Sequence, residues 1–420
     1  MPSASETQDQ LTAAGPTEAA DVVLSFSAAM LRAGNPASRT RHWTEVVARK
    51  LGFDAVSISL SLDGVTAGLH RQDVRITAVR EIGPPGINAA RIAALEQLAR
   101  TAKPGVAPGG IAAALAQIES APPLYSPVQT TAAIGVASGA FAFLNGAAAP
   151  EMVATAIAGA TGQYLRSWLS RRHFNHHGVS ALSAFVASAA YVLVATLMPY
   201  AGLGFAHYSV GFIASVLFLV PGFPLIAGLF DLLQHQTVAA VSRLAYGMMM
   251  LLAVALGLSI VIGIAGLDVS RGPPLELAYP LKLLLRAAAS FLAASAFAML
   301  FNGSPRMVLA AGLLALVAND LRLGLVDMGM MPAPAAFLAA LTIGLVALLA
   351  GERLGIPRIA MTVAPIVIMV PGVSAFEMIV RFNRGQVLEA LQATATFAFV
   401  IGALAVGLAA ALVLSPRRRG

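Results

Sequence analysis

The sequence predicts an α-helical polytopic membrane protein with about ten transmembrane helices, preceded by a small N-terminal α+β domain. Of its 420 residues, 58% are hydrophobic and only 11% are charged, whereas about a quarter of the residues in a soluble globular chain are charged. Long apolar stretches begin only after residue 125, and two apolar motifs occur twice in the same order. This composition excludes a soluble enzyme, a nucleic-acid-binding protein and a disordered chain.

The charged residues divide the chain into two parts. Residues 1–125 hold 11 Lys+Arg and 11 Asp+Glu, whereas residues 126–420 hold 16 and 9, so the whole net charge of +7 lies in the apolar part. Basic residues that flank apolar segments are typical of membrane orientation and not of nucleic-acid binding. The chain has no Cys, which excludes disulfides and thiol catalysis.

Residues 17–125 predict a soluble domain with the element order ααβββαα, after a disordered segment at 1–16. A helical pattern ends at Gly34, a second helix stops at Gly52, and Asp63 begins the turn of a β-hairpin. The domain shows no catalytic constellation. No secretory signal peptide is recognisable before it, so we expect it to stay in the cytoplasm.

Ten apolar segments are long enough to cross a membrane, which takes about 20 residues. The predicted spans are 128–146, 150–169, 179–200, 208–230, 238–266, 277–300, 305–326, 333–351, 359–380 and 391–414. With the soluble domain inside, ten basic residues fall in inner connections and five in outer ones, which fits the positive-inside rule and places both termini in the cytoplasm. The inner residues are Arg166, Arg171, Arg172, Arg243, Arg306, Arg353, Arg358, Arg417, Arg418 and Arg419; the outer ones are Arg271, Lys282, Arg322, Arg381 and Arg384.

Two pairs of motifs predict an internal repeat. SGAFAFLNGAAAPEMV (138–153) resembles SAFAMLFNGSPRMV (295–308), and LFLVPGFPLIAGLFDLL (217–233) resembles VIMVPGVSAFEMIVRF (367–382). Chance similarity between Ala- and Gly-rich helices is the alternative, but the two matches occur in the same order.

The repeat divides the membrane part at residue 270. Each copy, 126–270 and 271–420, contains five predicted spans. Because five is odd, the copies insert with opposite orientation. Such 5+5 inverted repeats are typical of secondary transporters, which bind their substrate at the repeat interface.

A Pro-Gly pair interrupts one apolar segment in each copy, at Pro221-Gly222 and Pro371-Gly372. Pro and Gly both break a helix, and the freed N–H and C=O groups are tolerated at membrane depth only where other groups or a cavity satisfy them. Such groups suit a zwitterion, although a simple kink is the alternative reading. The residues predicted to bind substrate are Asn145, Pro221, Gly222, Asn302, Pro371 and Gly372.

Ionisable residues near these breaks are candidates for proton coupling or charge pairing. They are Asp231, Arg243, Arg286, Asp320 and Glu377. Buried carboxylates can shuttle protons, and Arg243 lies where it could pair with Asp231. For Asp231, Arg243 and Asp320 an interfacial position is the alternative. The sequence predicts no metal site and no cofactor, and it lacks a GxxxxGK[ST] phosphate loop.

Three segments resemble the threonine/serine exporter family. They are MLRAGNPASRTRHWTEVVARKLGFDAVSISLS near the N-terminus, YSPVQTTAAIGVASGAFAFLNG at the first span, and VPGFPLIAGLFDLLQHQTVAAVSRLAYG at the fourth and fifth spans. The resemblance covers nearly all of residues 17–414. The second copy departs from the first because Ser374 replaces Pro224 and Glu377 or Arg381 takes the charged position.

The resemblance implies ten spans, a cytoplasmic N-terminal domain and proton-motive-force-driven export of threonine and serine across the inner membrane. In some relatives the two halves are separate chains, and some relatives are associated with dicarboxylate export. The alternatives are therefore an exporter or channel for another small metabolite such as a C4-dicarboxylate, and a membrane-embedded enzyme, for which we find no catalytic cluster. The expected partners are the substrate, protons and membrane lipid. Assembly into a homo-oligomer stays open.

Overall fold

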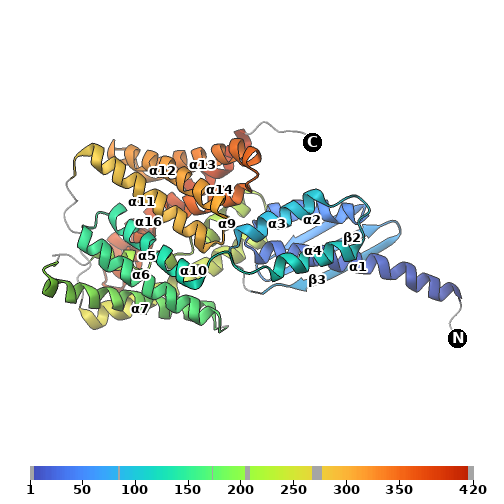
Figure 1. The fold of residues 1–420 in the computed structure, drawn as a ribbon, viewed down its shortest axis with the longest axis horizontal. Coiled ribbons are helices and arrows are strands. Elements are labelled where there is room, and N and C mark those ends of the chain that lie inside the picture. The colour runs from blue at the N-terminus through green and yellow to red at the C-terminus, as the bar shows by residue number, and fades with distance from the viewer. Residues whose placement is uncertain (1–3, 84–85, 173, 204–208, 267–276, 415–420) are drawn as a thin grey trace. The chain divides into compact units, whose positions relative to one another are not determined.

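The chain folds into two compact units (Figure 1). The computed structural model describes residues 4–83, 86–172, 174–203, 209–266 and 277–414. Unit 1 comprises Met1–Pro123 together with Asp231–Arg243, and unit 2 comprises Leu124–Phe230 and Leu244–Gly420. The sequence assigned Asp231–Arg243 to the first membrane repeat. The predicted repeat boundary at 270, Arg271 and the basic cluster Arg417–Arg419 lie outside the described residues.

Unit 1 contains its elements in the predicted order. They are α1 (Ala4–Arg32), α2 (Ala37–Lys50), β1 (Ala55–Leu60), β2 (Gly64–Arg71), β3 (Val74–Glu81), α3 (Ala89–Thr101) and α4 (Pro108–Ser120). Because α1 begins at Ala4, residues 4–16 are helical where the sequence predicted disorder. The strands form an antiparallel sheet in the order β1-β2-β3, and α1 packs against β2 and β3.

Two glycines end the first two helices of unit 1, as the sequence predicted. Gly34 (φ 90°) and Gly52 (φ 89°) both lie in the left-handed region, which glycine adopts at no steric cost. A Cβ at Gly34 would also approach the Gly86 carbonyl oxygen within 2.5 Å. The chain therefore turns sharply between Arg32 and Ala37.

The described residues of unit 2 form helices and the loops that connect them. Its elements are α5 (Pro127–Leu144), α6 (Ala149–Ser170), α7 (His176–Leu197), η1 (Met198–Ala201), α8 (Ser209–Ala214), η2 (Leu217–Leu219), α9 (Gly222–Leu233), α10 (Thr237–Ala265), α11 (Tyr279–Leu300), α12 (Pro305–Asp327), α13 (Pro332–Leu354), α14 (Arg358–Val367), α15 (Gly372–Asn383) and α16 (Val387–Leu414). The last residues of α9 and the first of α10 belong to unit 1.

Seven helices in the described part are long and apolar enough to cross a membrane, or up to nine if each of two bent helix pairs counts as one span. The sequence predicted ten. The segment that falls short is α6, which occupies the second predicted span and carries Glu151 and Arg166. The two bent pairs occupy the fourth and ninth predicted spans.

One close helix–helix contact occurs in both halves of unit 2. A Cβ at Gly257 in α10 would collide with the Ala181 carbonyl oxygen of α7, and a Cβ at Gly407 in α16 would collide with the Phe337 carbonyl oxygen of α13. Small residues let helix backbones approach this closely. Helices α5 and α11, which begin the two halves, pack against each other.

Candidate functional site

Both Pro-Gly pairs interrupt a helix in the same way. The α8/η2–α9 pair bends by 60° at Pro221, and the α14–α15 pair bends by 43° at Pro371. At the first break, the Gly222 N–H donates to the Val220 carbonyl at 2.8 Å; at the second, the Gly372 N–H donates to the Val370 carbonyl at 2.7 Å. A bond from the N–H of one residue to the carbonyl two positions earlier closes a γ-turn, and the backbone angles of Pro371 (φ −77°, ψ 65°) are those of the inverse form. We call these turns the first and the second break.

The two breaks lie against each other. A Cβ at Gly222 would lie 3.0 Å from the Val370 Cγ2 atom of the second break. A Cβ at Gly372 would lie 3.1 Å from the Val220 Cγ2 atom of the first break and 2.7 Å from Leu217 Cδ2. The contact is therefore reciprocal: each glycine meets the valine that accepts the turn bond in the other break.

Each break opens a new helix and so exposes backbone donors. The first N–H groups of a helix have no intrahelical acceptor, and the helix dipole makes this end electropositive. In α9 the donor at the third helical position is removed by Pro224, whereas α15 has Ser374 there, half-buried with its N–H intact. The arrangement can attract a carboxylate at either break.

The two asparagines predicted to bind substrate both bond to backbone groups. Asn145 caps the C-terminal end of α5, and its Nδ2 donates to the Phe141 carbonyl at 2.8 Å. Asn302 adopts a left-handed conformation (φ 56°), and its Oδ1 accepts the Leu124 N–H at 2.7 Å.

The two asparagines occupy different positions at the ends of their helices. In the first half the left-handed residue after the helix is Gly146 (φ 97°), followed by a bond from Ala147 N to Ala142 O; in the second half it is Asn302, followed by a bond from Gly303 to Ala298. Asn302 therefore occupies the position of Gly146. Phe141 and Phe297, which lie in the last turn of α5 and α11, make a T-shaped ring contact at 5.7 Å.

Asp231 and Arg243 form a buried cluster within unit 1. Their side chains are 0% and 6% exposed, and Arg243 Nη1 lies 3.5 Å from Asp231 Oδ2. Asp231 Oδ1 accepts the Ala37 N–H at 3.0 Å, and Arg243 Nη2 donates to the Asn35 carbonyl at 2.8 Å. We call these four residues the Asp231–Arg243 cluster. It joins the end of α9 and the start of α10 to the loop before α2.

Arg286 pairs with an acid that the sequence did not single out. Its guanidinium makes an ion pair with Asp327 of α12, and Lys282 Nζ lies 3.3 Å from the same carboxylate. Nearby in α12, Asp320 has a buried Oδ1 atom with no hydrogen-bond partner among the described residues. Glu377 lies half-buried in α15.

Two polar groups in unit 2 were missed by the sequence reasoning. Glu151 is 7% exposed, and its Oε1 accepts the Gly211 N–H at 2.6 Å and the Tyr191 hydroxyl at 3.2 Å. Asn319 is fully buried and donates to Ser290 Oγ at 2.8 Å. A signal for Glu151 existed, since an acid inside an apolar segment generally faces the protein interior.

Among the described residues no group of three or more His, Cys, Asp or Glu side chains could hold a metal ion.

Comparisons with known proteins identify a transport family. Residues 21–265 match the model of the threonine/serine exporter family, ThrE. Residues 286–414 match a second model, described as "Threonine/Serine exporter, ThrE". No solved structure matches the chain.

Two curated proteins are similar to the chain, and both are named "Probable succinate transporter subunit YjjP". The one from Escherichia coli K12 is 27% identical over 221 residues, which are 52% of this chain and 84% of that protein. The one from Klebsiella aerogenes is 23% identical over 239 residues, 57% of this chain and 90% of that protein.

Proposed function

This chain belongs to the threonine/serine exporter family, and we propose that it is a secondary active exporter of threonine and serine, driven by the proton-motive force. The observation that carries the proposal is the reciprocal contact between the two breaks, Gly222 against Val370 and Gly372 against Val220. Two interrupted helices that meet inside a membrane bundle are the usual construction of a transporter substrate site.

The backbone at the breaks suits a small amino acid. The α-carboxylate would bind the free donors at the start of α9 or α15, where the helix dipole favours negative charge. The ammonium group would bind carbonyl oxygens released at the ends of the preceding half-helices. Pro221, Gly222, Pro371 and Gly372 would position these groups. Asn145 and Asn302 would act only indirectly, since both bond to backbone.

The proposed architecture is a 5+5 inverted repeat of ten spans in the cytoplasmic membrane, with α6 as the tenth span and both termini inside. Support comes from the similar turn bonds at the two breaks, the similar contacts of Gly257 and Gly407, and the positive-inside count. A mean hydropathy lowered by Glu151 and Arg166 is compatible with a span that faces the bundle interior.

Proton coupling needs a carboxylate that changes charge during transport. Asp320, Glu377 and the newly found Glu151 are the candidates that lie in unit 2 with the breaks. Asp231 is a weaker candidate than the sequence indicated, because its charge is already paired with Arg243 and bonded to Ala37.

A C4-dicarboxylate such as succinate is the second candidate substrate. The two curated relatives carry succinate in their names. The paired breaks also offer two helix starts, one for each carboxylate of a dicarboxylate. Those relatives are named as subunits, whereas this chain matches two successive family models, so we infer that its second half replaces a separate partner chain.

Transport by proteoliposomes containing the purified chain tests the proposal. We expect counterflow of labelled threonine, stimulated by an imposed pH gradient and strongly reduced in Pro221→Ala and Pro371→Ala. Pro305→Ala is the matched control, because Pro305 is an exposed proline in the first turn of α12 and breaks no helix. Counterflow of succinate alone would select the second candidate, and full activity in both break variants would remove the proposed site.

A further inference from the structure

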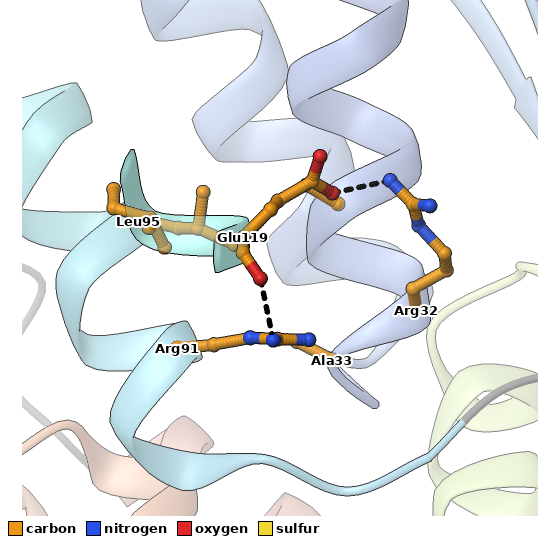
Figure 2. Close-up of a pocket in the computed structure, with 7 residues that line it drawn as sticks. Arg32, Ala33, Arg91, Leu95 and Glu119 are labelled. Carbon is orange, nitrogen blue, oxygen red and sulfur yellow. Dashed lines mark hydrogen bonds and ion pairs between the residues drawn. The ribbon is translucent and has the colours of Figure 1, made fainter. Parts of the chain in front are cut away.

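Unit 1 contains a pocket that no part of the transport proposal uses (Figure 2). Its volume is about 160 Å³, far above the roughly 10–15 Å³ that one water molecule needs. The lining residues come from α1, the residue that follows it, α3 and α4. They are Ala29, Arg32, Ala33, Arg91, Leu95, Ile118 and Glu119. All of them belong to unit 1.

Three charged groups converge in this pocket. Figure 2 shows the guanidinium groups of Arg32 and Arg91 approaching Glu119 from two directions. Arg32 makes an ion pair with the Glu119 carboxylate, and Arg91 Nη2 donates to the Glu119 carbonyl oxygen at 2.7 Å. The Arg91 Nε atom is buried and has no hydrogen-bond partner in the described part of the chain. A buried donor without an acceptor leaves the Arg91 guanidinium incompletely satisfied by the protein, whereas such groups are rarely left unpaired.

The Arg32–Glu119 pair is easily opened by a ligand. Its side chains are 47% and 40% exposed, and ion pairs in contact with water contribute little to stability. A carboxylate that enters the pocket can replace Glu119 as the partner of Arg32 and also bind Arg91, whose planar guanidinium favours carboxylates. Glu119 is then left facing the ligand and needs a cation.

We propose that this pocket binds a small α-amino acid, with its carboxylate on Arg32 and Arg91 and its ammonium group on Glu119. A zwitterion satisfies all three charged groups at once. A dicarboxylate would satisfy the arginines but place its second charge beside the Glu119 carboxylate. The apolar wall, formed by Ala29, Leu95 and Ile118 among others, fits a short side chain. This inference does not depend on which solute crosses the membrane.

The absence of cysteine from the chain allows a direct test. A single cysteine is introduced by Ile118→Cys at the pocket, and a control cysteine by Val79→Cys on β3, where the side chain is 70% exposed. The purified full chain is then alkylated with a maleimide in the presence or absence of threonine. At ten times its dissociation constant, threonine should slow alkylation of the Ile118→Cys protein about tenfold, since only the empty fraction reacts. The Val79→Cys protein should react at an unchanged rate.

Further arms define the ligand and the site. Succinate and ethanolamine, which each lack one of the two required charges, should give no protection. Arg91→Gln or Glu119→Gln in the Ile118→Cys background should remove the protection by threonine, whereas Pro221→Ala in that background should retain it. Protection by succinate alone, or loss of protection in the Pro221→Ala protein, would overturn the assignment, as would equal protection of the two cysteines or no protection by threonine.

Discussion

The two breaks share a backbone conformation, but the helices after them end in different surroundings. Each break is a turn closed by a glycine N–H, and each leads into a twelve-residue helix, α9 or α15. The backbone at the two helix ends is alike: the Gln236 N–H bonds the Asp231 carbonyl, and the Gln386 N–H bonds the Arg381 carbonyl, each at 2.9 Å. Only the side chains differ, since Asp231 is buried in unit 1 and Arg381 is not buried.

The conformation that the two breaks share is therefore separate from the surroundings of the two helix ends, which differ. The first break continues into a helix whose end is held by the Asp231–Arg243 cluster and the loop before α2. The second break continues into a helix that ends in a charged, largely exposed segment. A substitution at either break should therefore impair the protein. A substitution at a helix end should do so only at the end of α9.

The largest expected effect is that of Asp231→Ala. The substitution leaves Arg243 buried without a countercharge, and removing one partner of a buried pair costs about 3–5 kcal/mol. Arg381→Ala, at the corresponding position of α15, should change the free energy of unfolding by less than about 1 kcal/mol. Denaturant unfolding of the detergent-solubilised chain measures both changes.

A double variant sharpens this comparison. Asp231→Leu with Arg243→Met removes both charges, and such apolar replacements of a buried pair are often nearly neutral. The double variant should therefore be more stable than Asp231→Ala. If Asp231→Ala and Arg381→Ala destabilise the chain equally, the two helix ends are not held differently.

An intermediate effect is expected from adding a methyl group at each break. A Cβ at Gly372 would lie 2.7 Å from Leu217 Cδ2, closer than any contact of a Cβ at Gly222, where the nearest atom is at 3.0 Å. Overpacking of this kind costs about 1–3 kcal/mol. Gly372→Ala should therefore reduce transport and thermal stability more than Gly222→Ala does.

The matched control for these two variants is Gly402→Ala in α16, where a Cβ would meet no atom within 4 Å. This control should leave transport unchanged. If Gly222→Ala lost more transport activity than Gly372→Ala, the contacts described here would not determine how the two breaks behave during transport.

The positions of the breaks and helix ends were predictable because their causes are local. Proline and glycine restrict or relax the backbone of their own turn, whatever the rest of the fold. Helices therefore end at Pro221-Gly222, Pro371-Gly372, Gly34 and Gly52 for local reasons. The reciprocal contact of the breaks was not predictable, since it joins residues about 150 positions apart whose side chains are ordinary valines and glycines.

The partners of the charged residues were predicted unevenly for the same reason. Asp231 and Arg243 are close in sequence, and their pairing was foreseen. The Ala37 N–H that Asp231 also binds is 194 residues away, and a backbone donor has no sequence signal. Arg286 was expected to need a partner, but Asp327 lies 41 residues further along, at the end of a helix where an acid is unremarkable.

The smallest expected change in stability comes from making the second break resemble the first. Ser374→Pro places a proline where α9 has Pro224, in the first turn of a helix, where proline is tolerated. The free energy of unfolding should change by less than about 1 kcal/mol.

The Ser374→Pro variant nevertheless removes the Ser374 N–H. The KM for the exported solute should therefore rise if that donor binds the carboxylate of the solute, with kcat less affected. Ser374→Ala keeps the N–H and serves as the control. Equal KM values for Ser374→Pro and Ser374→Ala would assign carboxylate binding to α9 alone, because the two helix starts would then differ in function despite their matching turns.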